Sequence, residues 1–251
     1  MAIISGPQRW WIDSNPTFAA KQAVVQDNLL LNLDAGVSSS LSNGGSGTTW
    51  YNLKGTGNNA IKYGPTYSSS VGNGSFLFDG YNDRFECGNI TGFYATNSLT
   101  LEAWVRLTSM TGDDGDNSFI IQGGGSYLRF DFRTSGNYIQ FRLGGAASGT
   151  INTSSTVSLN TWYHLVGTWD GSNVNFYLNN SLQGTKTRSY TLPDSIVTDF
   201  GRYRMTTQDP IPSEDASQLN GYLSTVRIYN KALTATEVSQ NFNVYKGRFG
   251  L

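Results

Sequence analysis

The single histidine of the chain, His164, lies in the segment LNTWYHLVGTWDGSNVNFYLNN, six residues before Asp170. In a hydrolytic triad, a histidine and an aspartate must lie within hydrogen-bonding distance of each other. The residues from Trp162 to Trp169 alternate like a strand, and the sequence 170–173 (DGSN) is typical of a turn. At ~3.3 Å per residue, His164 and Asp170 would lie about 20 Å apart along one strand. We therefore predict that His164 is a structural strand residue and not a catalytic one.

Paired carboxylates are the second chemistry to consider, because glycosidases need two acids positioned on either side of the scissile bond. The chain has four glutamates, and they are far apart in the sequence: Glu86, Glu102, Glu214 and Glu237. No other catalytic set is present. We predict that the protein is not an enzyme and has no catalytic residues.

Two acidic stretches are candidate calcium sites, because Ca²⁺ prefers carboxylate and amide oxygens. The first is a compact turn that contains Asp79, Asn82 and Asp83. The second is the loop TGDDGDNS, which contains Asp113, Asp114 and Asp116. A structural interpretation is favoured at both: Asp83 caps backbone donors or pairs with an arginine, and the loop is a solvated hairpin tip. No cofactor is expected to be required, with Ca²⁺ as the one candidate.

Aromatic and arginine side chains alternate with apolar ones along several predicted strands. In 99–107, Leu99, Leu101 and Ala103 point one way, while Trp104 and Arg106 point the other. Aromatic rings beside amide and guanidinium groups can stack on sugars. The candidate carbohydrate-binding residues are Trp104, Arg106, Tyr127, Arg129, Tyr138 and Arg142. The alternative is that they are buried against the N-terminal arm, the C-terminal helix or another subunit.

Composition sets the framework that must position these residues. The chain has 251 residues, of which 14% are charged, against about 25% in average proteins. The 29 glycines favour many short strands joined by turns. A net charge of −1 without clustered lysines argues against nucleic-acid binding. The single cysteine, Cys87, excludes an intrachain disulfide. The N-terminus does not resemble a signal peptide, and no apolar run is long enough to cross a membrane, so synthesis in a cytoplasm is expected.

Short apolar runs bounded by turn residues predict the strands of a sandwich or barrel. They span 29–33, 76–78, 99–107, 119–122, 127–132, 138–143, 162–169, 174–178 and 222–229. One helix is predicted after Thr234, where Thr234 and Glu237 fit a capping box. We expect an N-terminal arm (1–27), a jelly-roll domain (28–233), and a C-terminal helix and tail (234–251) packed on the domain or on a partner.

Four segments resemble motifs of laminin-G-like, concanavalin A-like jelly-roll domains and follow the order of that family. They are FLFDGYND (76–83), LTLEAWV (99–105), WYHLVGTWDG (162–171) and GYLSTVRIYNKALT (221–234). The resemblance implies an all-β fold, an antiparallel β-sandwich. Ser224-Thr225 departs from the family, in which an acidic residue commonly precedes V-R-I-Y. The E-x-D-x-E acids of glucanases with this fold have no counterpart here, which agrees with a non-enzymatic protein.

The C-terminal sequence QNFNVYKGRFG (240–250) resembles the ends of jelly-roll structural proteins from tailed bacteriophages. This implies a non-enzymatic virion protein, made in the host cytoplasm, and most directly a capsid decoration or head-fibre module. Its expected partners are other virion proteins and further copies of itself, with no nucleic acid and no membrane span. The alternative is a tail-associated adhesin or a carbohydrate-binding module with a host-surface glycan as its ligand. The candidate docking residues are Trp10, Trp11, Phe18, Phe242, Tyr245 and Phe249.

Overall fold

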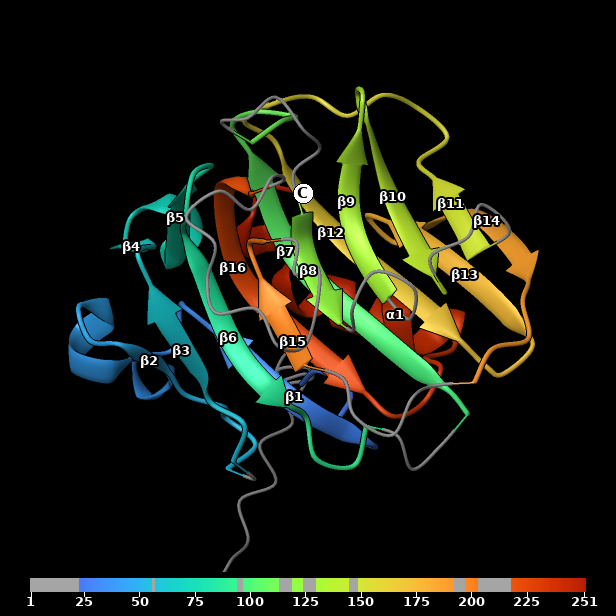
Figure 1. Cartoon of the computed structure of the whole chain (residues 1–251), viewed down its shortest axis with the longest axis horizontal. Helices are drawn as coiled ribbons and strands as arrows, with labels where there is room; N and C mark the ends of the chain where they lie inside the picture. Colours follow the sequence, from blue (N-terminus) through green and yellow to red (C-terminus); the bar gives the residue numbers. More distant parts are fainter. Residues whose placement is uncertain are drawn as a thin grey trace, which may run out of the picture.

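The computed structural model describes residues 23–55, 57–93, 97–112, 119–123, 130–144, 149–191, 197–202 and 218–251. These residues form two antiparallel sheets that pack face to face, and one α-helix lies behind the rear sheet of the two in Figure 1. The predicted fold class, an antiparallel β-sandwich with a short C-terminal helix, is confirmed.

The sheet that lies behind in Figure 1, here called sheet A, carries the segments with the family motifs. Its strand order is β14 (Ser181–Thr187), β13 (Asn173–Leu178), β12 (Trp162–Trp169), β7 (Leu99–Leu107), β16 (Asn220–Tyr229), β5 (Ser75–Asp79) and β4 (Thr66–Ser68). Strand β1 (Leu29–Asp34) also pairs with β16.

The front sheet, sheet B, is built mostly from shorter strands. Its order is β11 (Thr150–Asn152), β10 (Tyr138–Leu143), β9 (Phe130–Ser135), β8 (Phe119–Gly123), β15 (Val197–Phe200), β6 (Arg84–Asn89), β3 (Ala60–Tyr63) and β2 (Thr49–Trp50). Four 3₁₀ turns are also described: η1 (Ser38–Ser40), η2 (Ser42–Gly45), η3 (Val71–Asn73) and η5 (Lys246–Arg248). Strands β11 and β2 lie at opposite edges of the sheet, which Figure 1 shows on its right and left.

The core lies between the sheets, and the period-2 alternation of the strands fills it. In β7, the predicted inward residues Leu99, Leu101 and Ala103 are fully buried in the core cluster. In β12, Trp169 also lies in this core, whereas Trp162 lies on the other face, against Phe249. The two tryptophans therefore lie on opposite faces of the strand.

Helix α1 (Ala235–Tyr245) begins as predicted. The Thr234 side chain accepts from the Glu237 N–H, and the Glu237 carboxylate accepts from the Thr234 N–H, which completes the capping box. Val238 of the helix packs with Val166, Tyr229 and other buried residues in a second, smaller cluster. The helix therefore covers the outer face of sheet A.

Candidate binding site

His164 and Asp170 do not meet. His164 is fully buried, and its Nε2 atom lies 3.2 Å from Oε1 of Glu102 on the neighbouring strand β7. Asp170 closes the β12–β13 turn, where its carboxylate accepts from the N–H groups of Ser172 and Asn173. The actual neighbour of His164 is 62 residues away in sequence, so local spacing did not reveal it.

Glu102 is the centre of a buried polar cluster beneath helix α1. Arg227 Nη1 donates to Glu102 Oε1 at 2.7 Å, and Asn241 Nδ2 of the helix donates to Oε2 at 2.6 Å. Burial alone would raise the pKa of this carboxyl, but the Arg227 guanidinium and the His164 imidazole lower it to about 2. The acid is therefore held as a structural anion, because its oxygens are occupied and closed off from solvent.

Trp104 corrects the predicted sugar-binding face. The indole is fully buried, with ring centroids 4.8 Å from His164 and 4.2 Å from Phe249. The prediction of an exposed stacking platform at Trp104 is wrong, because the C-terminal tail covers this part of sheet A. Arg106 is half-buried over the Tyr222 ring, and its Nη2 donates to Asn160 at 3.3 Å.

Two other members of the sugar-binding set, Tyr138 and Arg142, lie on the opposite sheet, in β10. Arg142 is buried and makes two hydrogen bonds of 2.8 Å to the carboxylate of Asp131, so its role as a free sugar contact is also wrong. Tyr138, at the start of β10, is 38% exposed. Tyr127 and Arg129 lie outside the described residues. The four members that the structure describes are divided between two sheets and do not form one face.

The C-terminal docking candidates pack on the domain itself. Phe249 is buried between the rings of Trp104 and Trp162, and Phe242 stacks on Trp104 at 5.8 Å. The Tyr245 hydroxyl donates to Asp34 Oδ2 at 2.7 Å; burial raises its pKa to about 12, although Arg227 opposes the shift. These rings therefore are not exposed anchors, and Phe249 is corrected as a docking residue. The candidates Trp10, Trp11 and Phe18 lie outside the described residues.

Arg248 fixes this tail to the sheet. Its Nη1 pairs with Asp34 Oδ1 at 2.6 Å, its Nε donates to the Gly72 carbonyl, and its Nη2 donates to the Gly74 carbonyl and to Ser224 Oγ. Ser224, which stands where the family commonly has an acid, thus accepts from an arginine of the tail.

The candidate calcium turn uses its carboxylates internally. Asp83 Oδ2 accepts from the Asp79 N–H at 3.0 Å, and Asp79 Oδ1 accepts from the Tyr81 N–H at 2.9 Å. Burial raises the pKa of Asp83 to about 6. Asn82 offers its carbonyl to Arg84 Nη1 at 3.5 Å. Within the described segments, no group of three or more histidine, cysteine, aspartate or glutamate side chains is arranged to hold a metal ion. Asp113, Asp114 and Asp116 lie outside them, and calcium binding stays a prediction.

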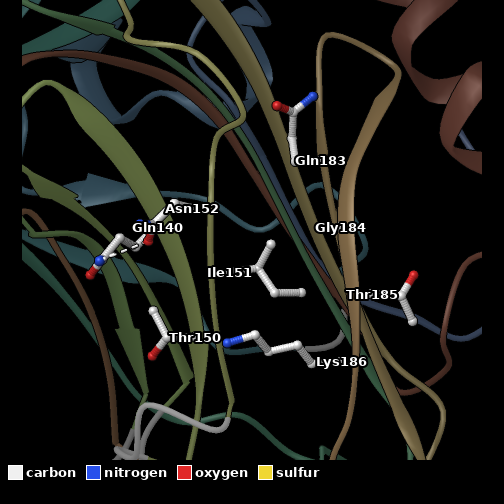
Figure 2. A pocket seen from close by; sticks show the side chains of 8 residues that line it. All are labelled: Gln140, Thr150, Ile151, Asn152, Gln183, Gly184, Thr185 and Lys186. Carbon is white, nitrogen blue, oxygen red and sulfur yellow. Dashed lines mark hydrogen bonds between the residues drawn. The ribbon is translucent and has the colours of Figure 1, made fainter.

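A groove of about 450 Å³ opens where the two sheets meet at one edge of the sandwich, between β11 of sheet B and β14 of sheet A (Figure 2). Its lining is mostly polar: Gln140, Thr150, Ile151, Asn152, Gln183, Gly184, Thr185 and Lys186. Figure 2 shows the Lys186 side chain extending from β14 toward β11. We refer to it as the edge groove.

Neighbouring strands hold the amides of the edge groove in place. The β10–β11 register sets Gln140 opposite Asn152, and Gln140 Nε2 donates to Asn152 Oδ1 at 2.8 Å. Arg133 Nε holds the other end of Gln140 at 2.9 Å. Across the groove, Gln183 Oε1 accepts from both the N–H and the hydroxyl of Ser154. These hydrogen bonds hold three amide side chains of the lining, Gln140, Asn152 and Gln183, in place.

Gly184 of β14 lies close to Ile151 of β11, across the edge groove. A Cβ atom there would lie 3.1 Å from Ile151 Cγ2, so a side chain at this position would require the Ile151 side chain to shift by a few tenths of an ångström. Ile151, the one apolar side chain of the lining, is buried in the core cluster. Such a groove can bind a polar ligand, and it carries no acid–base pair. Sequence reasoning missed β14, because SLQGTKT lacks the apolar alternation that marks a strand.

A second surface feature lies at the opposite edge of sheet B, around β2 and β3. Four large hydrophobic side chains are exposed there by 40–55%: Tyr51, Ile61, Tyr63 and Tyr81. The Arg84 guanidinium lies 4.1 Å from the centroid of the Tyr63 ring. Tyr81 belongs to the turn whose Asp83 side chain sits against Gly64, the residue after Tyr63. We call these four residues and Arg84 the tyrosine patch.

The carboxylates on the outer side of sheet B are paired with arginines. Glu86 Oε1 accepts from Arg84 Nε and Arg202 Nη2, each at 2.9 Å, and Asp199 pairs with Arg202 Nε at 3.0 Å. These ion pairs link β6 to the end of β15. They also neutralise the Glu86 and Asp199 carboxylates on this sheet.

A family model for the concanavalin A-like lectin/glucanases superfamily (Laminin_G_3) matches residues 79–239, more than half of the chain. The chain therefore belongs to this superfamily. The laminin-G-like, concanavalin A-like resemblance of the four motifs is confirmed.

Solved structures share the fold at low sequence identity. Domain 4 of the arabinanase AbnA from Geobacillus stearothermophilus, solved with arabinotriose, matches with a TM-score of 0.60 and 14% identity, over 87% of this chain and 98% of that one. The receptor-binding domain of botulinum neurotoxin type G matches with a TM-score of 0.61 and 19% identity, over 87% and 51%. A Trypanosoma rangeli sialidase mutant matches at 0.65 and 16%, over 91% of this chain and 35% of the sialidase. The chain thus spans about a third of the sialidase and about half of the neurotoxin domain.

The search of curated proteins returned no significant match. Among the described helices, none is long and apolar enough to span a membrane.

Proposed function

We propose that this chain is a non-enzymatic structural module of a tailed-bacteriophage virion, most directly a capsid decoration or head-fibre protein. The resemblance of residues 240–250 to the ends of phage structural proteins carries this proposal. In the fold, these residues form the latch of the domain: Asn241 binds Glu102, Tyr245 and Arg248 bind Asp34, and Phe249 stacks on Trp104. The residues that carry the resemblance therefore also hold the C-terminal segment against the domain.

The pairing of the acids supports a non-catalytic role. Glycoside hydrolysis needs one carboxyl group as an acid and a second as a base or nucleophile, both open to substrate. Glu102 is buried with three partners, and Glu86, Asp131 and Asp199 are ion-paired with arginines. Asp83, whose pKa is raised, is 6% exposed and lies against Gly64.

The tyrosine patch supports attachment by protein–protein contact. Tyrosine and arginine are enriched in interface hot spots, and grouped exposed apolar side chains mark interaction surfaces. We assign to the tyrosine patch the docking role that the sequence had suggested for Phe249. Trp10 and Trp11 of the N-terminal arm remain proposed docking residues.

The test is incorporation into particles. We expect antibodies against the chain to label purified virions, and a variant lacking residues 1–20 to fold normally but stay off the particle. A control variant, Leu251→Ala, removes an exposed side chain at the other end and should be incorporated normally. Particles that lack the chain altogether would contradict the virion proposal, and normal incorporation of the truncated chain would contradict the arm's role.

A second candidate function, lectin-like glycan binding, is favoured by the edge groove. Its amides and hydroxyls each donate and accept hydrogen bonds, as sugar hydroxyls do, and its volume falls in the range of small-ligand sites. Glycan binding at the edge groove corresponds to the adhesin or carbohydrate-binding alternative from the sequence, but its proposed site is the edge groove and not the surface around Trp104.

Glycan-array binding by the whole chain tests this candidate. We expect binding that is lost in Asn152→Ala, which removes an amide of the groove, and retained in Asn43→Ala, which removes an exposed loop amide near β2. Binding that survives Asn152→Ala would place the ligand elsewhere on the molecule.

A further inference from the structure

Residues 246–251, which follow helix α1, place an arginine and a phenylalanine in a shaped site on the outer face of sheet A. The Arg248 guanidinium donates to four oxygen atoms at 2.6–2.9 Å, and the buried Phe249 ring contacts two tryptophans. The residues that receive these two side chains are Asp34, Gly72, Gly74, Ser224, Trp104 and Trp162. We call these six residues the tail cradle, and residues 246–251 the hexapeptide.

Contacts outside the hexapeptide hold the acceptors of the tail cradle in position. The Gly36 N–H and the Tyr245 hydroxyl both donate to the Asp34 carboxylate, at 2.8 and 2.7 Å. The Ser224 hydroxyl donates to the Gly74 carbonyl. These bonds join parts of the domain to each other, so they can form without the hexapeptide.

Two glycines leave the space that the arginine and phenylalanine side chains occupy. A Cβ atom on Gly36 would lie 2.5 Å from Arg248 Nη2, and a Cβ atom on Gly72 would lie 3.0 Å from Phe249 Cε1. Both side chains therefore occupy spaces that larger residues at these positions would close.

The main chain of the hexapeptide is hydrogen-bonded locally. The N–H groups of Phe249 and Leu251 both donate to the Lys246 carbonyl. The tail cradle is thus bound through the side chains of Arg248 and Phe249, and these contacts can be made equally well by a hexapeptide from another molecule.

We propose that the tail cradle is a binding site for an arginine–phenylalanine peptide, and that it can take the hexapeptide of a second copy of this chain. Exchange of an identical segment preserves its contacts and is a low-cost route to a dimer. Six extended residues span about 20 Å, enough to cross from one copy to a neighbour in contact with it. Phe249 is buried in the single chain, so this is the exchange of an internal contact and not docking through an exposed ring. The inference does not depend on the virion or glycan proposals.

A synthetic peptide, KGRFGL, tests the site in the double variant Arg248→Ala/Phe249→Ala. We expect about 1 mM peptide, the effective concentration that a short tether provides, to raise the urea midpoint of this variant and to shift its tryptophan emission to the blue. If the variant is unfolded in water, the peptide has to restore its folded fraction. The same peptide with Arg248→Ala should have neither effect. The chain with Leu251→Ala, whose own hexapeptide keeps both side chains, should gain much less from KGRFGL.

Mixing two variants tests the second copy as the source of the peptide. The double variant keeps its tail cradle and lacks the two ligand side chains, whereas Gly36→Ala keeps those side chains and places a Cβ atom where its own Arg248 guanidinium lies. We expect the equimolar mixture to form a larger species than either variant forms alone, measured by size-exclusion chromatography with light scattering.

The outcomes separate the site from its occupant. If KGRFGL has no effect on the double variant, or the alanine peptide has an equal effect, the tail cradle is not an arginine–phenylalanine site and the whole inference is overturned. Stabilisation by KGRFGL without a larger species in the mixture would overturn the second copy as the occupant. A larger species in the mixture, together with stabilisation by KGRFGL alone of the two peptides, supports both parts.

Discussion

At the scale of single residues, the pKa values of two buried carboxyl groups shift in opposite directions, although burial alone would raise both. Glu102 has Arg227, His164 and Asn241 around it, and its pKa falls to about 2. Asp83 accepts a backbone N–H and lies near Lys62, but desolvation prevails and its pKa rises to about 6. Glu102 therefore stabilises the fold above its unfolded pKa of 4.5, a contribution lost only as the pH falls toward about 2. The spacing along one strand was enough to reject a His164–Asp170 pair. The contact between His164 and Glu102 follows only from the β7–β12 register, which the structure shows.

Asp83 gives a pH-dependent prediction. Its folded pKa of about 6 lies above the unfolded value of 3.8, so the stability linked to its protonated form is present below pH 3.8 and is lost as the pH rises through 6. Asp83→Asn cannot ionise and still offers an oxygen to the Asp79 N–H. We expect this variant to be more stable than the unmodified chain at pH 8 by about 1 kcal/mol, less than the whole shift implies because of solvent screening.

Urea unfolding at pH 8 and pH 4 measures this difference. The advantage of Asp83→Asn should shrink or vanish at pH 4, where both side chains are neutral in the fold. A difference that is the same at both pH values would show that Asp83 stays ionised in the native protein.

At the scale of elements, the C-terminal segment acts as a latch on the outer face of sheet A. Helix α1 could be predicted from Thr234 and Glu237, because a capping box is a local signal. The surface on which this segment packs could not be predicted, because Asp34, Trp104 and Ser224 come from three strands that are far apart in the sequence. For the same reason, the outward face of β7 offered two interpretations, ligand binding or burial, and the structure shows burial for Trp104.

Phe249→Ala tests the latch. It removes a buried ring that stacks on Trp104 and lies against Trp162, and the usual cost of such a change is about 3–5 kcal/mol. We expect the free energy of unfolding to drop by about 3 kcal/mol and the tryptophan emission to shift to the red as both indoles meet water. Leu251→Ala, two residues on and exposed, should change neither property. An unchanged emission spectrum in Phe249→Ala would mean that the tail does not cover these indoles.

At the scale of the whole molecule, the two surface features lie at opposite ends of sheet B. The tyrosine patch lies around β2 and β3, and the edge groove lies between β11 and β14 (Figure 1). A module with this layout can attach through one edge and present a ligand groove at the other. This arrangement links the virion proposal to the glycan-binding candidate without requiring one surface to serve both.

The long strands were predictable because their apolar alternation is a local pattern; β7, β10 and β12 begin and end at the predicted residues. The strands β2, β3, β6, β11 and β14 were missed. They show little apolar alternation, so pairing with their neighbours determines them. The edge groove lies largely on β11 and β14, and the tyrosine patch lies on or beside β2, β3 and β6, which is why the candidate site could not be predicted although the fold could.

A cryo-EM reconstruction of the phage particle to which we propose this chain belongs tests the central proposal most directly. We predict density for the jelly roll on the particle surface, with Tyr51, Tyr63 and Tyr81 facing the neighbouring virion protein and the β11–β14 edge facing solvent. A complete particle map without this density, or with the edge groove buried against the shell, would contradict the account.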